Sequence, residues 1–162
     1  MKHLIAIAAL CLGTVSSAGA QEHAGHTCEG GNCATADHVS TINGLVPPGR
    51  IAGLENVVDL ITKDLGDGRT LIVSRGVRLA GTRVGIHIHA YGGHTCVVSG
   101  AITDFVEGHD PSYFPAGTCY YMPPNTPMSA ANLGTEDAVL IDNFIVPTGE
   151  SPIEIIEPAA LK

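Results

Sequence analysis

The chain of 162 residues contains no tryptophan, and aromatic residues make up only 4% of it. A hydrophobic core therefore has to be built mainly from Val, Ile, Leu and Ala. Basic residues are also scarce: 8 Lys and Arg stand against 16 Asp and Glu, which gives a net charge of −8. Phosphate backbones and anionic lipid headgroups repel a protein of this charge. The composition argues against nucleic acid and anionic membranes as partners, and suits a cation or a neutral small molecule.

Long hydrophobic runs are missing apart from one at the N-terminus. Residues 4–12 form an apolar run that follows Lys2 and precedes a small-residue cleavage site at residues 18–20. The run is too short to span a bilayer. We therefore predict a signal peptide over residues 1–20 and an exported protein, in the periplasm or outside the cell, without membrane insertion. Cleavage removes one of the 8 basic residues and none of the 16 acidic ones, which leaves seven and sixteen, a net charge of −9.

The segment after the predicted signal peptide, residues 21–48, has no hydrophobic periodicity and is rich in metal-binding side chains. We predict a disordered arm here, ahead of one folded domain over residues 49–162. Such a composition can bind soft or borderline metals, and the alternative interpretation is a polar linker with one small disulfide. The side chains concerned are His23, His26, Cys28, Cys33 and His38.

Four cysteines remain after cleavage, an even number in an oxidising compartment. Four cysteines allow three pairings. We favour Cys28 with Cys33, which closes a small loop, and Cys96 with Cys119, which would join two strands. Free thiols beside a bound metal are the competing state.

The part of the chain after residue 49 reads as an all-β domain. Residues 51–65 have apolar side chains at the 3.6-residue spacing of one short helix, with a strand over residues 57–62 as the alternative. Short β-rich runs follow, separated by glycine and proline and without intervening helices. This spacing predicts an antiparallel sandwich or barrel. The runs cover residues 70–74, 83–89, 95–98, 101–106, 118–122, 128–132, 138–146 and 153–156.

Three histidines lie within eight residues in one of these runs. His87 and His89 alternate with isoleucines, so on a strand both imidazoles point to the same face. Two neighbouring imidazoles are half of a metal site. His94 follows after a turn-like segment with two glycines. The cluster predicts a metal site, against the alternative that the pattern arose by chance on a strand.

The chain also contains two spaced motifs built on glycine. The first consists of Gly81, five residues, His87-Ile88-His89 and a later Gly100; the second consists of Gly117, five residues, Pro123-Pro124-Asn125, two residues, Met128, three residues and Asn132. Together they resemble the two motifs of the cupin family, over residues 71–147. The resemblance implies a single-domain double-stranded β-helix, the jelly-roll barrel of cupins, whose mouth holds a divalent metal.

The ligand set departs from the three histidines and one glutamate of the family. Met128 stands in place of the second-motif histidine, Gly93 in place of the glutamate, and His94 follows one residue late. One step along a regular strand means the opposite face, so His94 can ligate only if the glycine turn shifts the register. We predict a metal site of His87, His89, His94 and Met128, with core filling as the alternative for Met128.

Imidazole and thioether donors favour copper, especially Cu(I), while iron, manganese and zinc stay open. The predicted function is an exported metal-binding protein in metal storage or handling. The alternative is a metal-dependent enzyme, dioxygenase- or isomerase-like, acting on a small oxygenated molecule; the family glutamate that would act as a base is missing. A third interpretation is a barrel that has lost its metal. The resemblance also implies a homodimer.

Two other polar features are open to interpretation. Arg83 is expected to face the barrel lumen, where it holds an anionic substrate or pairs with an acidic residue at the rim. A second group is predicted to form a solvated loop between two strands. Its members are Asp104, Glu107, His109 and Asp110.

Overall fold

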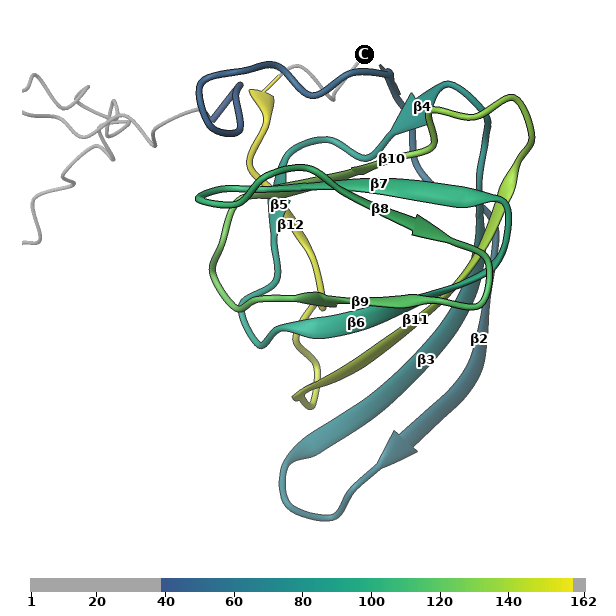
Figure 1. Cartoon of the computed structure of the whole chain (residues 1–162). Helices are drawn as coiled ribbons and strands as arrows, with labels where there is room; N and C mark the ends of the chain where they lie inside the picture. Colours follow the sequence, from purple (N-terminus) through teal and green to yellow (C-terminus); the bar gives the residue numbers. More distant parts are fainter. Residues whose placement is uncertain (1–38, 159–162) are drawn as a thin grey trace, which may run out of the picture. The chain divides into compact units, whose positions relative to one another are not determined.

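The structure is a computed structural model, and it describes residues 39–158 of the chain. These residues form two curled sheets that face each other, one with seven strands and one with five (Figure 1). The predicted all-β fold is thereby confirmed. The strands are β1 (Arg50–Ile51), β2 (Glu55–Asp64), β3 (Arg69–Arg78), β4 (Thr82–Arg83), β5 (His87–Ile88), β6 (Gly93–Ser99), β7 (Ala101–Val106), β8 (Ser112–Pro115), β9 (Cys119–Met122), β10 (Met128–Ala131), β11 (Ala138–Pro147) and β12 (Glu154–Ile155).

The five-stranded sheet has the order β2-β3-β11-β6-β9, with every neighbouring pair antiparallel. The other sheet has the order β1-β4-β10-β5-β12, with β7 and β8 joined to it through β10. The core lies between the sheets. As the composition requires, aliphatic residues supply much of it, and two methionines and two aromatic rings fill the remaining space. Its buried members are Val97, Ile102, Tyr120, Met122, Met128, Ala130, Ala138, Leu140, Phe144 and Val146.

The helix predicted for residues 51–65 is wrong and the alternative strand over residues 57–62 is confirmed, because residues 55–64 form strand β2. This strand is antiparallel to β3, with Asp59 opposite Ser74 and Thr62 opposite Ile72. Two register irregularities interrupt the pairing, and Asn56 adopts φ 51° beside the first of them. Irregular pairing disturbs the alternation of a strand. The apolar spacing of residues 54–61 therefore imitates a helical period, and pairing with β3 decides the structure.

The predicted strands after residue 69 are found, with one addition and one correction. Strand β8 pairs with β7 in a hairpin that the sequence did not indicate. Within the predicted solvated loop, Glu107, His109 and Asp110 are exposed. Asp104 is not part of that loop: it belongs to β7 and is 3% exposed.

The disulfide between Cys96 and Cys119 is present and joins β6 to β9, where the two residues lie opposite each other. This confirms half of the predicted pairing; Cys28 and Cys33 lie outside the described residues. The part of the predicted arm that is described, residues 39–48, contacts the barrel. Ile42 is 3% exposed, and the Asn43 side chain donates to the backbone oxygen of His109 at 2.7 Å. The packed unit therefore begins before residue 49.

Between residues 39 and 158, no helix of a length and hydrophobicity able to cross a bilayer occurs.

Candidate functional site

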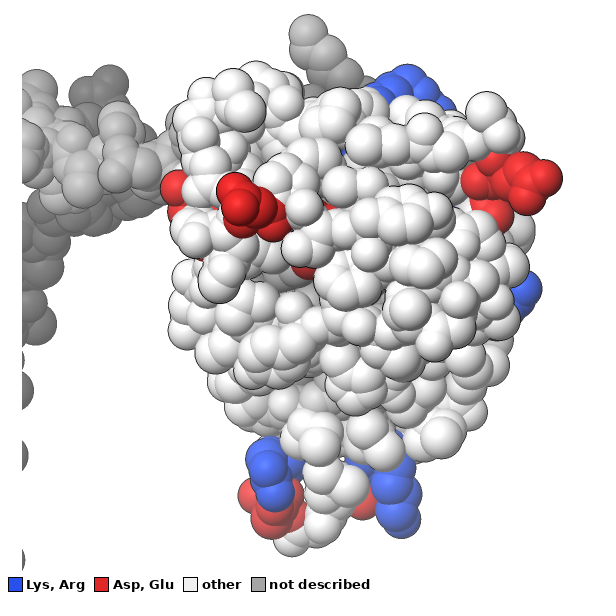
Figure 2. All heavy atoms as spheres, viewed as in Figure 1, with Lys and Arg blue, Asp and Glu red and all other residues white. Residues whose placement is uncertain are grey.

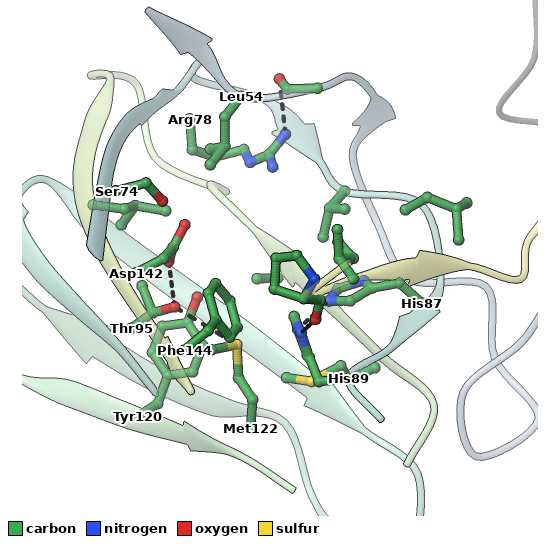
Figure 3. Close-up of a pocket in the computed structure, with 18 residues that line it drawn as sticks. Leu54, Ser74, Arg78, His87, His89, Thr95, Tyr120, Met122, Asp142 and Phe144 are labelled. Atoms are coloured by element: carbon green, nitrogen blue, oxygen red, sulfur yellow. Dashed lines mark hydrogen bonds between the residues drawn. The ribbon is translucent and has the colours of Figure 1, made fainter. Parts of the chain in front are cut away.

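A pocket of about 320 Å³ lies between the two sheets. Its walls are mostly apolar and its polar groups fall into two sets, as Figure 3 shows: two imidazoles on one side, and Arg78, Ser74 and Asp142 on the other. The side chains come from both sheets and from the C-terminal segment. The lining residues are Gly53, Leu54, Ser74, Arg78, Val84, His87, His89, Thr95, Tyr120, Met122, Met128, Ala130, Leu140, Asp142, Phe144, Pro152, Ile153 and Ile155.

His87 and His89 lie in the pocket together, as the alternation on their strand predicts. They are 3% and 2% exposed, and their Nε2 atoms are 3.1 Å apart. Each Nδ1 faces a backbone oxygen, that of Gly85 at 2.9 Å from His87 and that of Pro152 at 2.6 Å from His89. The Phe144 ring stacks on His89 with centroids 5.1 Å apart. Contacts at Nδ1 therefore fix the orientation of both imidazoles, and their Nε2 atoms lie next to each other.

The two neutral rings carry too few protons to form a hydrogen bond between their Nε2 atoms. A carbonyl oxygen only accepts, so each Nδ1 carries a proton, and a neutral imidazole has only one. Both Nε2 atoms then carry a lone pair and no proton, and the two atoms are 3.1 Å apart. A third proton would relieve the repulsion, but burial lowers the pKa of His87 to about 3 and also lowers the pKa of His89. The pair is therefore neutral at pH 7, which is the form that binds metals.

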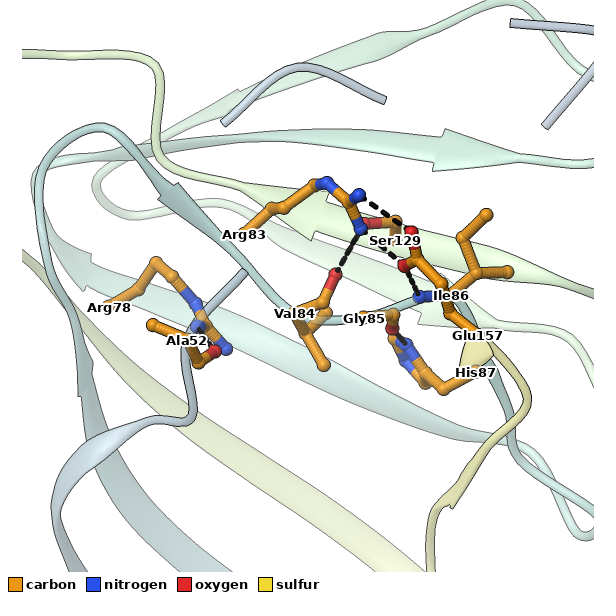
Figure 4. A network of polar contacts seen from close by, with 9 residues as sticks. All are labelled: Ala52, Arg78, Arg83, Val84, Gly85, Ile86, His87, Ser129 and Glu157. Atoms are coloured by element: carbon orange, nitrogen blue, oxygen red, sulfur yellow. Dashed lines mark hydrogen bonds and ion pairs between the residues drawn. The ribbon is translucent and has the colours of Figure 1, made fainter. Parts of the chain in front are cut away.

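The C-terminal segment positions His87. Glu157 accepts two hydrogen bonds from the Arg83 guanidinium, at 2.6 and 2.8 Å, and one from the Ile86 backbone nitrogen at 2.7 Å (Figure 4). Strand β12 pairs with β5 and places Ile155 opposite His87. Glu157 therefore binds Arg83 before Gly85 and the Ile86 backbone after it. The Gly85 oxygen between them accepts the hydrogen bond from His87 Nδ1.

Arg83 does not face the lumen as a substrate ligand. It is 3% exposed and forms an ion pair with Glu157, so the second of its two predicted roles is closer to the structure. The partner comes from the C-terminal segment, 74 residues away along the chain.

The other two predicted metal ligands lie in different places. Met128 is fully buried, lines the pocket and lies opposite His87 in the pairing of β10 with β5. His94 is exposed on β6, next to the inward-facing Thr95, and so points to the outer face of the sheet. The glycine turn does not shift the register enough to bring it in. The structure therefore brings His87, His89 and Met128 together and leaves His94 apart.

The position of Gly93 has no room for a side chain. A Cβ atom at this position would lie 2.5 Å from Cδ1 of the Phe144 ring and 3.0 Å from the Asn143 oxygen. The ring that stacks on His89 therefore fills the space that a longer side chain needs. Asn125, which replaces a motif glycine, adopts φ 53° and keeps the left-handed turn.

Five polar or sulfur-bearing side chains of the pocket were not predicted: Ser74, Arg78, Thr95, Met122 and Asp142. Thr95 donates its hydroxyl proton to Asp142 Oδ1 at 2.5 Å, and the same hydroxyl lies 3.7 Å from Met122 Sδ. Burial raises the pKa of the Asp142 carboxyl, against the opposing effects of Thr95 and Arg78. An acidic residue inside the apolar run of β11 was the available sequence signal, since strand alternation places it on the same face as Leu140 and Phe144.

A transition metal fits the histidine pair in distance and chemistry. First-row metals bind imidazole nitrogen at about 2.0–2.1 Å, so two nitrogens 3.1 Å apart are close enough to hold one ion between them. Within residues 39–158, no group of three or more His, Cys, Asp or Glu side chains converges.

No protein-family model and no curated protein matches the sequence. Solved structures do match. One is a cupin-like protein from Thermotoga maritima, with 21% identity and a TM-score of 0.50 over 62% of this chain and 74% of that chain. Another is a DMSP lyase from Ruegeria pomeroyi, with 16% identity and a TM-score of 0.50 over 55% of this chain and 44% of the lyase.

The chain has the cupin fold. The double-stranded β-helix implied by the two motifs is confirmed, and the pocket between the sheets is the interior of the cupin barrel. At these identities the likeness concerns the fold, so the function is argued from the residues of the pocket.

Proposed function

We propose that this protein is an exported cupin that binds one transition-metal ion, preferably copper, at His87 and His89. The supporting observation is the pair of Nε2 atoms 3.1 Å apart, each in a ring whose Nδ1 is committed to a backbone oxygen. A cation replaces the repulsion between the two lone pairs with two coordinate bonds. Met128 and Met122 line the same pocket and supply soft donors, which favour copper over zinc or manganese.

The test is the metal content of the full chain after export and purification. Wild type is expected to hold copper at one equivalent more than His87→Ala or His89→Ala. His94→Ala is the matched control, because His94 lies on the outer face, and it should keep the wild-type content. The N-terminal arm stays intact in every variant, so metal bound there contributes equally. Equal metal content in wild type and His87→Ala would overturn the site, and stoichiometric iron or manganese without copper would overturn the choice of metal.

Met128→Leu tests the thioether. Leucine keeps a similar apolar volume, so the fold is expected to survive. Affinity for Cu(I) should fall while affinity for zinc changes little, because only the soft donor is lost. An unchanged Cu(I) affinity would show that Met128 packs in the core and does not bind the metal.

A metal-dependent enzyme remains the second candidate, and one observation favours it. Asp142 places a carboxyl group in the pocket that also contains the histidine pair, which supplies the acid–base group that the cupin motifs of this chain lack. A bound metal ion would supply Lewis acidity toward an oxygen of the substrate. A screen with small oxygenated acids should then show turnover that is lost in His87→Ala; folded, metal-loaded wild type without turnover would favour binding alone.

The homodimer implied by the resemblance stays a prediction, as does export through residues 1–20.

A further inference from the structure

Arg78 is a buried guanidinium group that has no counterion in the described part of the chain. The residue is 3% exposed, and no carboxylate of residues 39–158 lies within 4.0 Å of it. Its Nη1 donates to the backbone oxygens of Ala52 at 2.5 Å and Gly53 at 3.2 Å. A buried charge without an opposite charge costs several kcal/mol. The structure therefore maintains an unfavourable charge at the wall of the pocket that contains the histidine pair.

The donors of Arg78 that remain free are the ones a carboxylate prefers. Nε is buried and has no partner, and Nη2 has no acceptor among residues 39–158. The two nitrogens form one edge of the planar guanidinium, and such an edge binds both oxygens of a carboxylate at once. Figure 3 shows the group directed from β3 toward the pocket. A lysine could not present this edge.

Asp142 offers an acceptor on the same side of the pocket. Its Oδ1 accepts from Thr95, and its second oxygen receives no hydrogen bond from residues 39–158. It lies more than 4.0 Å from the Arg78 nitrogens, since no salt bridge joins the two side chains. A separation of more than 4.0 Å therefore lies between a donor edge and an acceptor that line the same pocket. A ligand ammonium group would lie close to the Arg78 cation, so a neutral hydroxyl is the better donor to Asp142.

We propose that Arg78 and Asp142 form a subsite for a small aliphatic hydroxy acid, with the ligand carboxylate on the guanidinium edge and the ligand hydroxyl on the Asp142 carboxyl. The subsite deepens the proposed function, because it shares the pocket of His87 and His89. A volume of about 320 Å³ is near the lower end for ligand pockets, roughly 300–1,000 Å³. The apolar side chains between the polar groups, among them Leu54, Leu140 and Phe144, suit a short hydrocarbon body.

The experiment is isothermal titration calorimetry on the full chain, both after metal removal with EDTA and after reloading with copper. The probes are 2-hydroxybutanoate, the deoxy acid butanoate and the uncharged 2-hydroxybutanamide. Wild type should bind the hydroxy acid about tenfold more tightly than butanoate and about 100-fold more tightly than the amide, because a hydrogen bond to a charged group contributes about 1.5–3 kcal/mol. Equal binding of acid and amide, or no binding in either metal state, would overturn the proposal.

Variants assign the two contacts. Arg78→Met should abolish the preference for acid over amide, and Arg78→Lys should keep part of it. Arg75→Met is the matched control, since Arg75 lies on the same strand with an exposed side chain, and it should behave as wild type. Asp142→Asn should remove only the preference for the hydroxy acid over butanoate. Folded Arg78→Met with wild-type discrimination would assign a purely structural role to Arg78.

The metal proposal and the acid proposal can fail separately. Loss of metal in His87→Ala, with acid binding retained by the metal-free protein, supports both. If the wild type binds the hydroxy acid but holds no metal, the Arg78–Asp142 subsite stands and the metal proposal fails. If it binds metal but does not discriminate between acid and amide, the histidine site stands and the subsite fails.

Discussion

Arg78 and Arg83 lie five residues apart and are both 3% exposed, yet they are compensated differently (Figure 4). Arg83 has both oxygens of Glu157 at 2.6 and 2.8 Å. Arg78 has backbone oxygens only. A guanidinium with its carboxylate in place is a structural element, here one that attaches the C-terminal segment to the strand of the histidines. A guanidinium without one is available to an anion from outside.

The same contrast separates two buried carboxyl groups. Hydrogen bonds from Arg83 lower the pKa of Glu157. Asp104 is also buried and has an oxygen without a partner among residues 39–158, and burial raises its pKa to about 7, against a smaller opposing effect of the Phe105 backbone. Of the two carboxyl groups, the one with a cationic partner has the lowered pKa and the one with deeper burial and no such partner has the raised pKa.

Removal of the Glu157 counterion would leave Arg83 as uncompensated as Arg78, and we expect this change to have the largest consequence. Glu157→Ala removes the counterion and leaves a buried charge, which should cost about 3–5 kcal/mol of unfolding free energy in denaturant titrations. Metal affinity should fall as well, because Ile86 loses the acceptor that positions the backbone beside His87. Glu154→Ala is the control on the same segment, since Glu154 is exposed. A loss no larger than that of Glu154→Ala would contradict the assigned role of the ion pair.

The pH dependence of stability tests the raised pKa of Asp104. Because the pKa of Asp104 is about 7 when folded and 3.8 when unfolded, the folded protein keeps a proton that the unfolded chain releases between these values. Stability should therefore fall as pH rises through that window, by up to about 1.4 kcal/mol per pH unit from this group. Asp104→Asn removes this term and should be more stable than wild type at pH 8. His87 and His89 titrate in both proteins, so the difference between the two curves isolates Asp104; parallel curves would contradict the prediction.

The smallest expected effect is the stability change in Arg78→Met without ligand. Loss of the hydrogen bonds to Ala52 and Gly53 is offset by removal of an uncompensated buried charge, so the net change should be within about 1 kcal/mol. Arg83→Met leaves Glu157 buried alone and should cost about 3–5 kcal/mol. Equal losses in the two variants, measured by denaturant unfolding, would show that the two arginines have the same role.

Sequence patterns predicted the sheet elements well where one face of a strand is buried. The alternation in residues 87–89 placed both imidazoles on the same side, and the motif spacing around Gly81 and Gly117 predicted the barrel. The pattern failed for β2, because irregular pairing with β3 disturbs the alternation that identifies a strand.

The metal ligands stay a prediction. Of the four predicted ligands, His87, His89 and Met128 line one pocket, and His94, one residue late in the motif, is exposed on the outer face. Arg78 and Asp142 lie in strands that were predicted without any assigned chemistry, and Arg83 was expected in the lumen.

Local periodicity and spacing thus determined which residues form strands and which neighbours on a strand share a face, because these properties depend on backbone geometry within a few residues. Counterions and pocket neighbours were decided only in the folded barrel. Glu157 reaches Arg83 across 74 positions, and the Phe144 ring fills the space beside Gly93. Electrostatic compensation depends on distance in space, so the chain order alone could not distinguish the paired arginine from the one that faces the pocket without a counterion.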